Sequence, residues 1–212
     1  MDIIKIVDER MAHNTYLVIE GEGVILIDAG AHVSKIEEHL KMYSPKPRLE
    51  AIMITHAHFD HVMELDNIIA KYGCQAYIFK DGKPMLYNID QNMSIMSPNP
   101  FKIKTKKDVR IFHDGDVFRF GDIEISCYNT PGHSQDSSCF VIGDNMFTGD
   151  TIFKVEHGRT DLYSGDRNQL RISLERILND LSAGCELFLP GHGANFDKDE
   201  LDYNLKRILG EE

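Results

Sequence analysis

Residues 56–61 constrain this chain more than any other feature, because they place four potential metal ligands within six positions. The segment reads His56-Ala-His58-Phe-Asp60-His61. It follows the apolar run 51–55, which is typical of a buried strand, and precedes residues 62–70, whose apolar spacing predicts a helix. Imidazole and carboxylate groups are ligands that suit zinc, iron or manganese. The sequence therefore predicts a metal site in a loop between a strand and a helix.

The spacing of these ligands indicates that one loop can serve two adjacent metal positions. His56 and His58 have one residue between them, so in an extended segment their side chains point to the same side. Asp60 and His61 fall where the helix begins and can point elsewhere. A lone histidine is usually a surface or packed core residue, but four ligands between one strand and one helix favour metal binding.

Three further segments repeat the order of strand, turn residues and potential ligand. The ligands are His133 after residues 123–128, Asp150 after residues 139–147, and His192 after residues 187–189. A glycine precedes each of the three and lets the backbone approach a compact centre. We therefore expect the ends of other strands to complete the metal site.

These motifs resemble the pattern of the metallo-β-lactamase superfamily, which is HxHxDH followed by a distant His, a bridging Asp and a last His. The match runs in order through Asp28, His56, His58, Asp60, His61, His133, Asp150 and His192. The resemblance covers nearly the whole chain and implies an α/β fold, the αββα sandwich of that family. In it, two mixed β-sheets lie between outer helices, with the metals at one edge where loops gather.

The resemblance also implies a role for each ligand. His56, His58 and His133 would hold one metal ion, Asp60, His61 and His192 would hold a second, and Asp150 would bridge the two. Asp28 would hold the other ring nitrogen of a histidine ligand, or it is simply a turn residue at the end of a strand. Two divalent metal ions are expected, zinc first, with iron or manganese as alternatives.

Residues 149–162 narrow the resemblance to small hydrolases similar to glyoxalase II and to the related persulfide dioxygenases. Both carry a GDxLF…GRTD block, which here reads GDTIF and then GRTDL. The resemblance implies that Arg159 binds substrate, for example a carboxylate through bidentate hydrogen bonds. Arg159 can equally pair with Asp161 inside the loop. Tyr163 is a candidate proton donor to a leaving group, or a loop aromatic.

The function implied by the resemblance is hydrolysis of a small-molecule thioester. Metal binding can lower the pKa of water from about 15.7 to about 7, which gives hydroxide at neutral pH. Asp60 would be catalytic by holding the second metal and orienting the hydroxide. A thiol with a pKa of about 8.5 leaves as thiolate without a strong acid. An ester or lactone, the substrate of an alternative hydrolase, leaves as an alkoxide and needs a proton.

Two alternatives from other classes stay open. A persulfide dioxygenase-like oxidoreductase would use a single iron held by His56, His133 and Asp150. A metal-bound module without catalysis is the other, although the complete ligand set argues against it. Recognition of glutathione is also open, because only twenty residues follow His192, where glyoxalase II has a helical domain.

Composition fits one domain, residues 1–212, and limits its partners. Lys and Arg total 23 against 34 Asp and Glu, and the net charge of −11 argues against a nucleic acid partner. Charges interrupt the first apolar run, and no stretch approaches membrane-spanning length. The four cysteines form no CxxC pair. We expect a cytoplasmic protein with reduced, buried cysteines and no membrane partner.

Other patterns predict the elements around the site. They are a hairpin over residues 16–27, a helix that a capping box opens at Ser34 and that ends before Pro45, a helix capped at Asp166 with an apolar stripe to Leu181, and a last helix over residues 201–209. Residues 81–108 are irregular and either cover the site as a lid or form a solvated connection.

Overall fold

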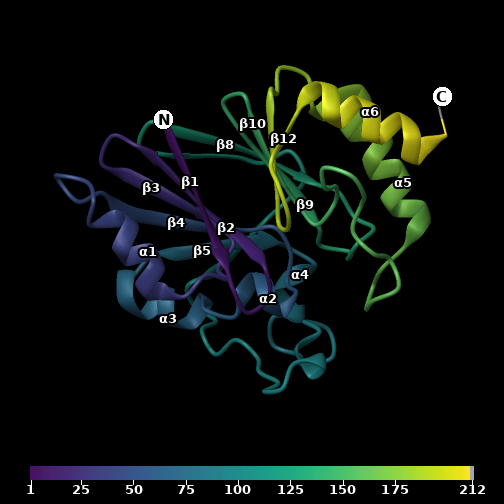
Figure 1. Ribbon diagram of the computed structural model, residues 1–212. Helices are drawn as coiled ribbons and strands as arrows, with labels where there is room; N and C mark the ends of the chain where they lie inside the picture. Colours follow the sequence, from purple (N-terminus) through teal and green to yellow (C-terminus); the bar gives the residue numbers. More distant parts are fainter. Residues whose placement is uncertain (211–212) are drawn as a thin grey trace.

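Two six-stranded mixed sheets form the centre of the molecule in the computed structural model, which describes residues 1–210 (Figure 1). In spatial order, the first sheet contains β1 (Asp2–Asp8), β2 (His13–Glu20), β3 (Gly23–Ile27), β4 (Arg48–Ile54), β5 (Gln75–Phe79) and β6 (Val109–Phe112). The second contains β12 (Phe196–Asp197), β11 (Leu187–Pro190), β10 (Asn145–Gly149), β9 (Ser138–Ile142), β8 (Ile123–Asn129) and β7 (Val117–Phe120). Strands β3 to β6 are parallel, as are β10 and β11, and the other neighbours are antiparallel.

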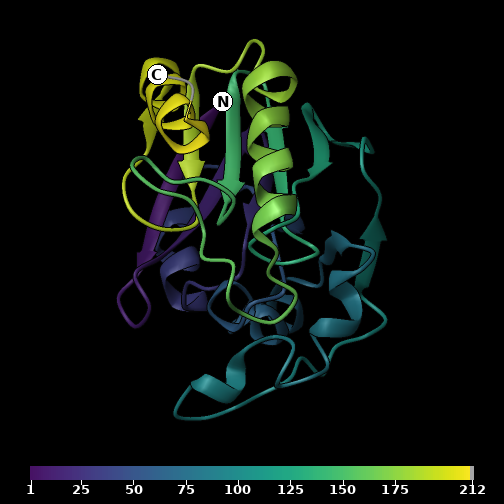
Figure 2. The ribbon, with the colours of Figure 1, turned by 90° about the vertical axis from the view of Figure 1, so that its right-hand side faces the viewer.

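Helices cover the outer face of each sheet. The first sheet carries α1 (Val33–Leu40), α2 (Phe59–Val62), α3 (Leu65–Tyr72) and α4 (Gly82–Met85). The second carries α5 (Arg167–Arg176), which continues as a π-helical turn over Ile177–Leu181, and α6 (Lys198–Leu209). Figure 2 shows α5 and α6 lying side by side over the second sheet. This arrangement confirms the prediction of two mixed sheets between outer helices.

Three apolar layers hold the sheets and helices together, and β3 shows how one strand serves two of them. Ile25 and Ile27 point between the two sheets, whereas Val24 and Leu26 point toward α1 and α3. A strand buried on both faces has no polar alternation, which is why residues 24–27 read as an unbroken apolar run. A third cluster joins the second sheet to α5 and α6.

The predicted hairpin and helices are present, with one correction at α1. The helix begins at Val33, and its N-cap is His32, whose Nδ1 accepts a hydrogen bond from the backbone N–H of Ser34 at 3.3 Å. The predicted capping box at Ser34 is therefore wrong. At α5 the predicted cap is confirmed, because the Asp166 side chain accepts hydrogen bonds from the backbone N–H groups of Asn168 and Gln169.

The sequence predicts buried, reduced cysteines and no segment long enough to span a membrane. All four cysteines are buried and unpaired within residues 1–210. In the same range, no helix combines the length and apolar character that crossing a membrane requires. The irregular segment between α4 and β6 extends beyond the sheets at the end where α2 lies (Figures 1 and 2).

Candidate metal centre

The seven predicted ligands come together at one edge of the two sheets. His56, His58, Asp60 and His61 follow β4, His133 follows β8, Asp150 follows β10, and His192 follows β11. These four strands all run toward the same edge, so the loops that leave them meet there. The ligand atoms form several overlapping groups of three that lie within 4.8 Å of one another and could hold metal ions.

The first group contains the imidazoles of His56, His58 and His133. His58 Nδ1 lies 3.1 Å from His56 Nε2 and 2.9 Å from His133 Nε2. A tetrahedral ion with metal–nitrogen distances of about 2.0–2.1 Å separates its ligand nitrogens by roughly 3.3 Å. The ring of His133 is fixed because its Nδ1–H donates to the backbone oxygen of Arg159 at 2.7 Å, which leaves Nε2 as the coordinating atom.

The second group contains Asp60, His61 and His192. Asp60 Oδ2 lies 3.1 Å from His192 Nε2 and 3.9 Å from His61 Nε2. His192 donates from Nδ1 to the backbone oxygen of Ala12 at 3.1 Å, so its Nε2 also faces the cluster. This group has one carboxylate and two imidazoles, whereas the first has three imidazoles, which is the division of donors that the family resemblance implies.

Asp150 lies between the two groups. Its Oδ1 is 3.4 Å from His61 Nε2, and its Oδ2 is 3.6 Å from His133 Nε2 and 3.7 Å from His192 Nε2. One carboxylate therefore faces imidazoles of both groups. Among the buried polar atoms without a hydrogen-bond partner in residues 1–210 are His61 Nε2 and Asp150 Oδ1. Buried groups of this kind require a partner, and a cation between them fits both.

The electrostatics of the first group favour neutral imidazoles. Burial and the neighbouring ring of His61 hold the pKa of His56 well below its usual value. Burial and the His133 ring lower the pKa of His58 to about 3. A histidine binds metal only through a deprotonated nitrogen. At neutral pH these rings therefore offer lone pairs without first losing a proton.

The carboxylates of the cluster are ionised. Burial alone would raise the pKa of Asp150, but the His61 and His192 rings hold it below its usual value. The pKa of Asp60 is likewise lowered against the effect of burial, by His61 and by the hydrogen bond with His192. The same carboxylates raise the pKa of His61 and of His192 against the effect of burial, so a metal ion at the second group would take the place of protons on these rings. Imidazoles and buried carboxylates together are a donor set that suits zinc, iron or manganese.

Asp28 has both of the roles that the sequence left open, as a turn residue at the end of a strand and as a partner of a ligand histidine. It follows β3 with a backbone φ of 61°, so it is a turn residue in the left-handed region. Its Oδ2 lies 2.8 Å from His61 Nδ1, and Thr55 donates to both of its oxygens at 2.8 Å. The carboxylate thus accepts from the Nδ1–H of His61 and directs Nε2 of that ring into the cluster.

His13 is a residue at the centre that sequence reasoning missed. It is fully buried in β2, with Nε2 3.1 Å from His61 Nδ1 and 3.6 Å from Asp28 Oδ2. Its ring therefore packs against the ligand histidine from the side opposite the cluster. A single histidine at the start of a strand carries no spacing signal, so the sequence alone could not have identified it.

Asp136 is a second missed residue, and it joins two ligand loops. It is fully buried, and its Oδ2 accepts a hydrogen bond of 2.8 Å from the backbone N–H of Ala57, between His56 and His58. Ser134, next to His133, donates to its Oδ1 at 2.7 Å. Burial raises the pKa of Asp136 to about 6. One carboxylate thereby sets the position of all three imidazoles in the first group.

A cavity of about 310 Å³ opens onto the cluster. Its lining residues are Met11, His58, Phe59, Asp60, Met93, Met96, His133, Asp150, Arg159 and Leu162. Arg159 lines it, and its guanidinium makes two bonds of 2.7 Å to Asp161, which is the internal pair that the sequence also allowed. Tyr163 is not among the described residues that line the cavity, and it is 41% exposed.

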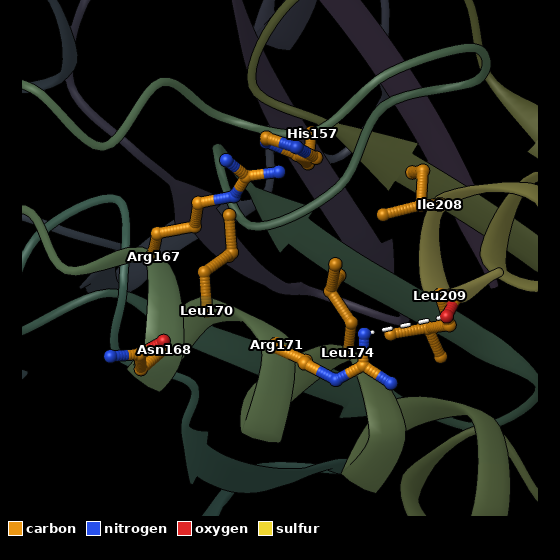
Figure 3. Close-up of a pocket in the computed structure, with 8 residues that line it drawn as sticks. All are labelled: His157, Arg167, Asn168, Leu170, Arg171, Leu174, Ile208 and Leu209. Atoms are coloured by element: carbon orange, nitrogen blue, oxygen red, sulfur yellow. Dashed lines mark hydrogen bonds between the residues drawn. The ribbon is translucent and has the colours of Figure 1, made fainter.

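A second cavity lies away from the metal ligands. It has a volume of about 130 Å³ and lies between α5 and α6. Figure 3 shows the residues that line it, among them Arg167, Arg171, Leu170, Leu174 and Ile208. None of the predicted site residues lines it. The ligand cluster and the cavity above it are therefore the part of the described chain in which the predicted site residues gather, with the exception of Tyr163.

Comparisons with known proteins agree with this geometry. A family model for the metallo-beta-lactamase superfamily matches residues 8–192. The probable metallo-hydrolase MJ0888 of Methanocaldococcus jannaschii is 32% identical over 208 residues, which cover 95% of this chain and 97% of that protein.

Solved structures share the same architecture. The crystal structure of the BLEG-1 B3 metallo-beta-lactamase has a TM-score of 0.86 at 25% identity, covering 98% of this chain and 99% of that one. The crystal structure of TTHA1623 in a di-iron-bound form has a TM-score of 0.80 at 27% identity, covering 95% and 98%. These likenesses confirm the predicted fold.

Proposed function

The chain belongs to the metallo-beta-lactamase superfamily, and on that premise we propose that it is a metal-dependent hydrolase that acts on thioesters through two metal ions. The observation that carries the proposal is the position of Asp150, whose carboxylate faces His61 on one side and His133 on the other. The names of two similar proteins support it: MJ0888 is a probable metallo-hydrolase, and TTHA1623 has a di-iron-bound form.

The two donor groups divide the ions between them. His56, His58 and His133 would hold the first ion, and Asp60, His61 and His192 the second, with zinc the best match to four- or five-coordinate nitrogen and oxygen donors. When bound, such ions would lower the pKa of a water molecule toward about 7 and polarise a substrate carbonyl. Asp60 lines the cavity, and in this proposal its carboxylate would orient the attacking water.

The choice of a thioester follows from the absence of an acid in the cavity wall. Apart from the proposed ligands, the described lining residues include one titratable group, the guanidinium of Arg159. Arginine keeps its proton at all accessible pH values, so it cannot supply one to an alkoxide. A thiolate with a parent pKa of about 8.5 leaves without protonation. An amide, ester or lactone is therefore a poorer substrate for this cavity.

The test is hydrolysis by protein that has been freed of metal and reloaded stepwise. Thioesters and oxygen esters with the same acyl group are compared as zinc is added. We expect activity to reach its maximum near two ions per chain and to favour the thioester by at least tenfold. Replacement Asp60→Asn should remove most of this activity, whereas His113→Ala, which changes an exposed histidine in another loop, should not. Equal rates on the ester, or no hydrolysis at any metal ratio, would contradict the proposal.

A further inference from the structure

Apolar side chains from four distant segments form the walls of the cavity above the ligand cluster. The ligands His58, Asp60, His133 and Asp150 make up its floor. The walls contain Phe59, Leu162 and three methionines. We call the three methionines, Met11, Met93 and Met96, the methionine wall. Thioether side chains are flexible and polarisable, so they fit irregular apolar groups of varied shape.

The segment that carries Met93 and Met96 is tied to the ligand loop. The backbone N–H of Phe59, the residue after His58, donates to the oxygen of Asn92 at 2.8 Å. Asn92 is itself fully buried, and its amide donates to the backbone oxygen of Phe101 at 3.0 Å. The irregular segment over residues 81–108 is therefore held in place here, and it covers part of the site.

The backbone at Met93 adds to this argument. Its φ is 62°, a left-handed conformation that non-glycine residues rarely adopt. Such a conformation persists only where the surrounding contacts determine it. The neighbouring Asn92 and Ser94 supply these contacts, since the backbone N–H of Ser94 donates to Asn92 Oδ1 at 2.9 Å and its hydroxyl donates to the oxygen of Phe101 at 2.6 Å.

Met11 is fixed from the opposite side. Its neighbour Ala12 accepts a hydrogen bond from the ring of His192 at 3.1 Å, so the turn before β2 is linked to a ligand. On its other side, Arg10 donates to the backbone oxygen of Gly30 at 2.9 Å and to Glu64 at 3.2 Å. Both parts of the methionine wall thus depend on backbone groups that also contact the ligands or their neighbours.

The charges of the cavity disfavour an anionic substrate group. Arg159 is the single cationic side chain among the described residues of its lining, and Asp161 already engages that guanidinium through two bonds. A carboxylate at the end of the acyl chain that points away from the ligand cluster would therefore leave water without meeting an unpaired cationic side chain among the described lining residues.

From these observations we propose that the substrate carries an uncharged, apolar acyl chain, which lies against the methionine wall while its carbonyl faces the ligand cluster. This inference rests on the proposed hydrolase function and names its substrate class. A volume of about 310 Å³ corresponds to roughly ten groups of about 30 Å³, the share of one water molecule in the liquid. The acyl chain that fits is thus short to medium in length.

The first test measures binding and needs no turnover. Alkyl hydroxamates from acetyl to octanoyl, and the succinyl compound as an anionic match, are titrated into the zinc-loaded protein by calorimetry. We expect affinity to rise by about twofold to fourfold for each added CH₂ group up to six or eight carbons, and the succinyl compound to bind at least tenfold more weakly than hexanoyl. Affinity that does not change with chain length, or that favours succinyl, overturns the inference.

Variants test whether the dependence of hydroxamate affinity on chain length comes from the methionine wall. Met96→Gln and Met11→Gln change side chains that are 63% and 40% exposed, so both proteins should fold. Each is expected to reduce the gain per CH₂ group while leaving the affinity of acetohydroxamate unchanged. Met42→Gln is the matched control, because Met42 is 69% exposed and does not line the cavity. An unchanged chain-length dependence in the double variant Met11→Gln/Met96→Gln would overturn the inference.

Kinetics with the corresponding thioesters separates the two proposals. If the chain-length dependence appears in binding but no thioester is hydrolysed, the methionine wall is supported and thioester hydrolysis fails. If all thioesters are hydrolysed equally, including succinyl, the hydrolase stands and the apolar substrate class fails. We expect kcat/KM to follow the same order as hydroxamate affinity, with hexanoyl or octanoyl highest.

Discussion

Single residues outside the ligand set decide which nitrogen each histidine presents. The Nδ1 atom of His61 faces Asp28, that of His133 faces the oxygen of Arg159, and that of His192 faces the oxygen of Ala12. In each case Nε2 is left toward the cluster. Such partners hold a ring in the orientation that coordination needs before any ion arrives, so the site is prepared by the protein itself.

Removal of one imidazole from the first group should remove one ion. We expect His133→Ala to lower the metal content by about one equivalent per chain, because three ligands become two while the second group keeps Asp60, His61 and His192. Elemental analysis after dialysis against buffer without metal measures this. His32→Ala is the control, since His32 caps α1 and is exposed. An unchanged metal content in His133→Ala would contradict the assignment.

Asp136 should matter for metal affinity without being a ligand. Replacement by Ala removes the acceptor for the N–H of Ala57 and frees the loop of His56 and His58. Loss of an outer partner of this kind costs about 10–100-fold in metal affinity. Competition with a chromophoric chelator measures that affinity. Asp136→Asn, which keeps an acceptor oxygen, should recover part of it, and equal losses in both variants would contradict a positioning role.

The same carboxyl group should give the metal-free protein a characteristic pH dependence. Burial raises the pKa of Asp136 from 3.8 to about 6, so its contribution to stability is fully present below pH 4. It is lost as the pH rises through about 6, by roughly 3 kcal/mol in all. The free energy of unfolding, measured with urea, should fall between pH 4.5 and pH 7.5. We expect this fall to be larger for the natural protein than for Asp136→Asn. Equal falls would contradict the raised pKa.

At this scale the sequence predicted the candidate ligands and one of their supports, Asp28, and it missed two others, His13 and Asp136. The six-residue motif and the glycine-flanked residues His133, Asp150 and His192 have spacing that carries information. His13 and Asp136 become significant only through contacts across 48 and 79 positions of the chain. No local pattern encodes such contacts, because they depend on how the two sheets pack.

At the scale of elements, the ends of the strands place the ligands, and Gly191 allows the chain after β11 to pass close to two of them. A Cβ atom at Gly191, at the end of β11, would overlap Asp150 Oδ1 and lie 2.7 Å from Cε1 of His61. The chain beside His192 thus passes directly over two ligands from other strands. Only a residue without a side chain fits there.

Gly191→Ala should therefore disturb the centre more than the fold. We expect loss of at least one metal equivalent together with a far-ultraviolet circular dichroism spectrum like that of the natural protein. Gly23→Ala is the matched control, because a Cβ at Gly23 would make ordinary contacts, the nearest at 3.6 Å. Full metal content in Gly191→Ala would contradict the close packing of this loop on the ligands.

Elements with strong periodicity were predictable, whereas their ends were less so. The hairpin of β2 and β3 and the cap of α5 at Asp166 agree with their sequence patterns. The start of α1 does not, because the ring nitrogen of His32 accepts the N–H of Ser34 and replaces the serine as the cap. Helix-capping statistics favour serine, and this local hydrogen bond overrides them.

At the scale of the whole molecule, the two sheets meet along one apolar layer, and the ligands from both sheets meet at its edge. Residues of the first sheet and of the second share this layer, for example Met53 with Phe140 and Phe147. The resemblance of the ligand motifs to the metallo-β-lactamase superfamily predicted this class of fold. The order of strands in each sheet, and the approach of His192 to Asp60 across the two sheets, required the structure.

Metal removal should consequently weaken the whole fold. The ligands come from both sheets, so ions bound among them link the two halves. Binding at 100 times the dissociation constant stabilises a protein by about 2.7 kcal/mol, which corresponds to roughly 5–10 °C in Tm at this size. Calorimetric scans with and without a chelator measure the shift. A Tm that does not change would contradict metal binding at the interface of the sheets.

The most direct test of the central claim is the metal content of the protein purified without added metal or chelator, expressed as equivalents per chain. Two donor groups around Asp150 predict a value near two, made up of zinc, iron or manganese. A value near one that is almost entirely iron would contradict the two-ion hydrolase. It would instead direct attention to oxygen uptake with a thiol persulfide.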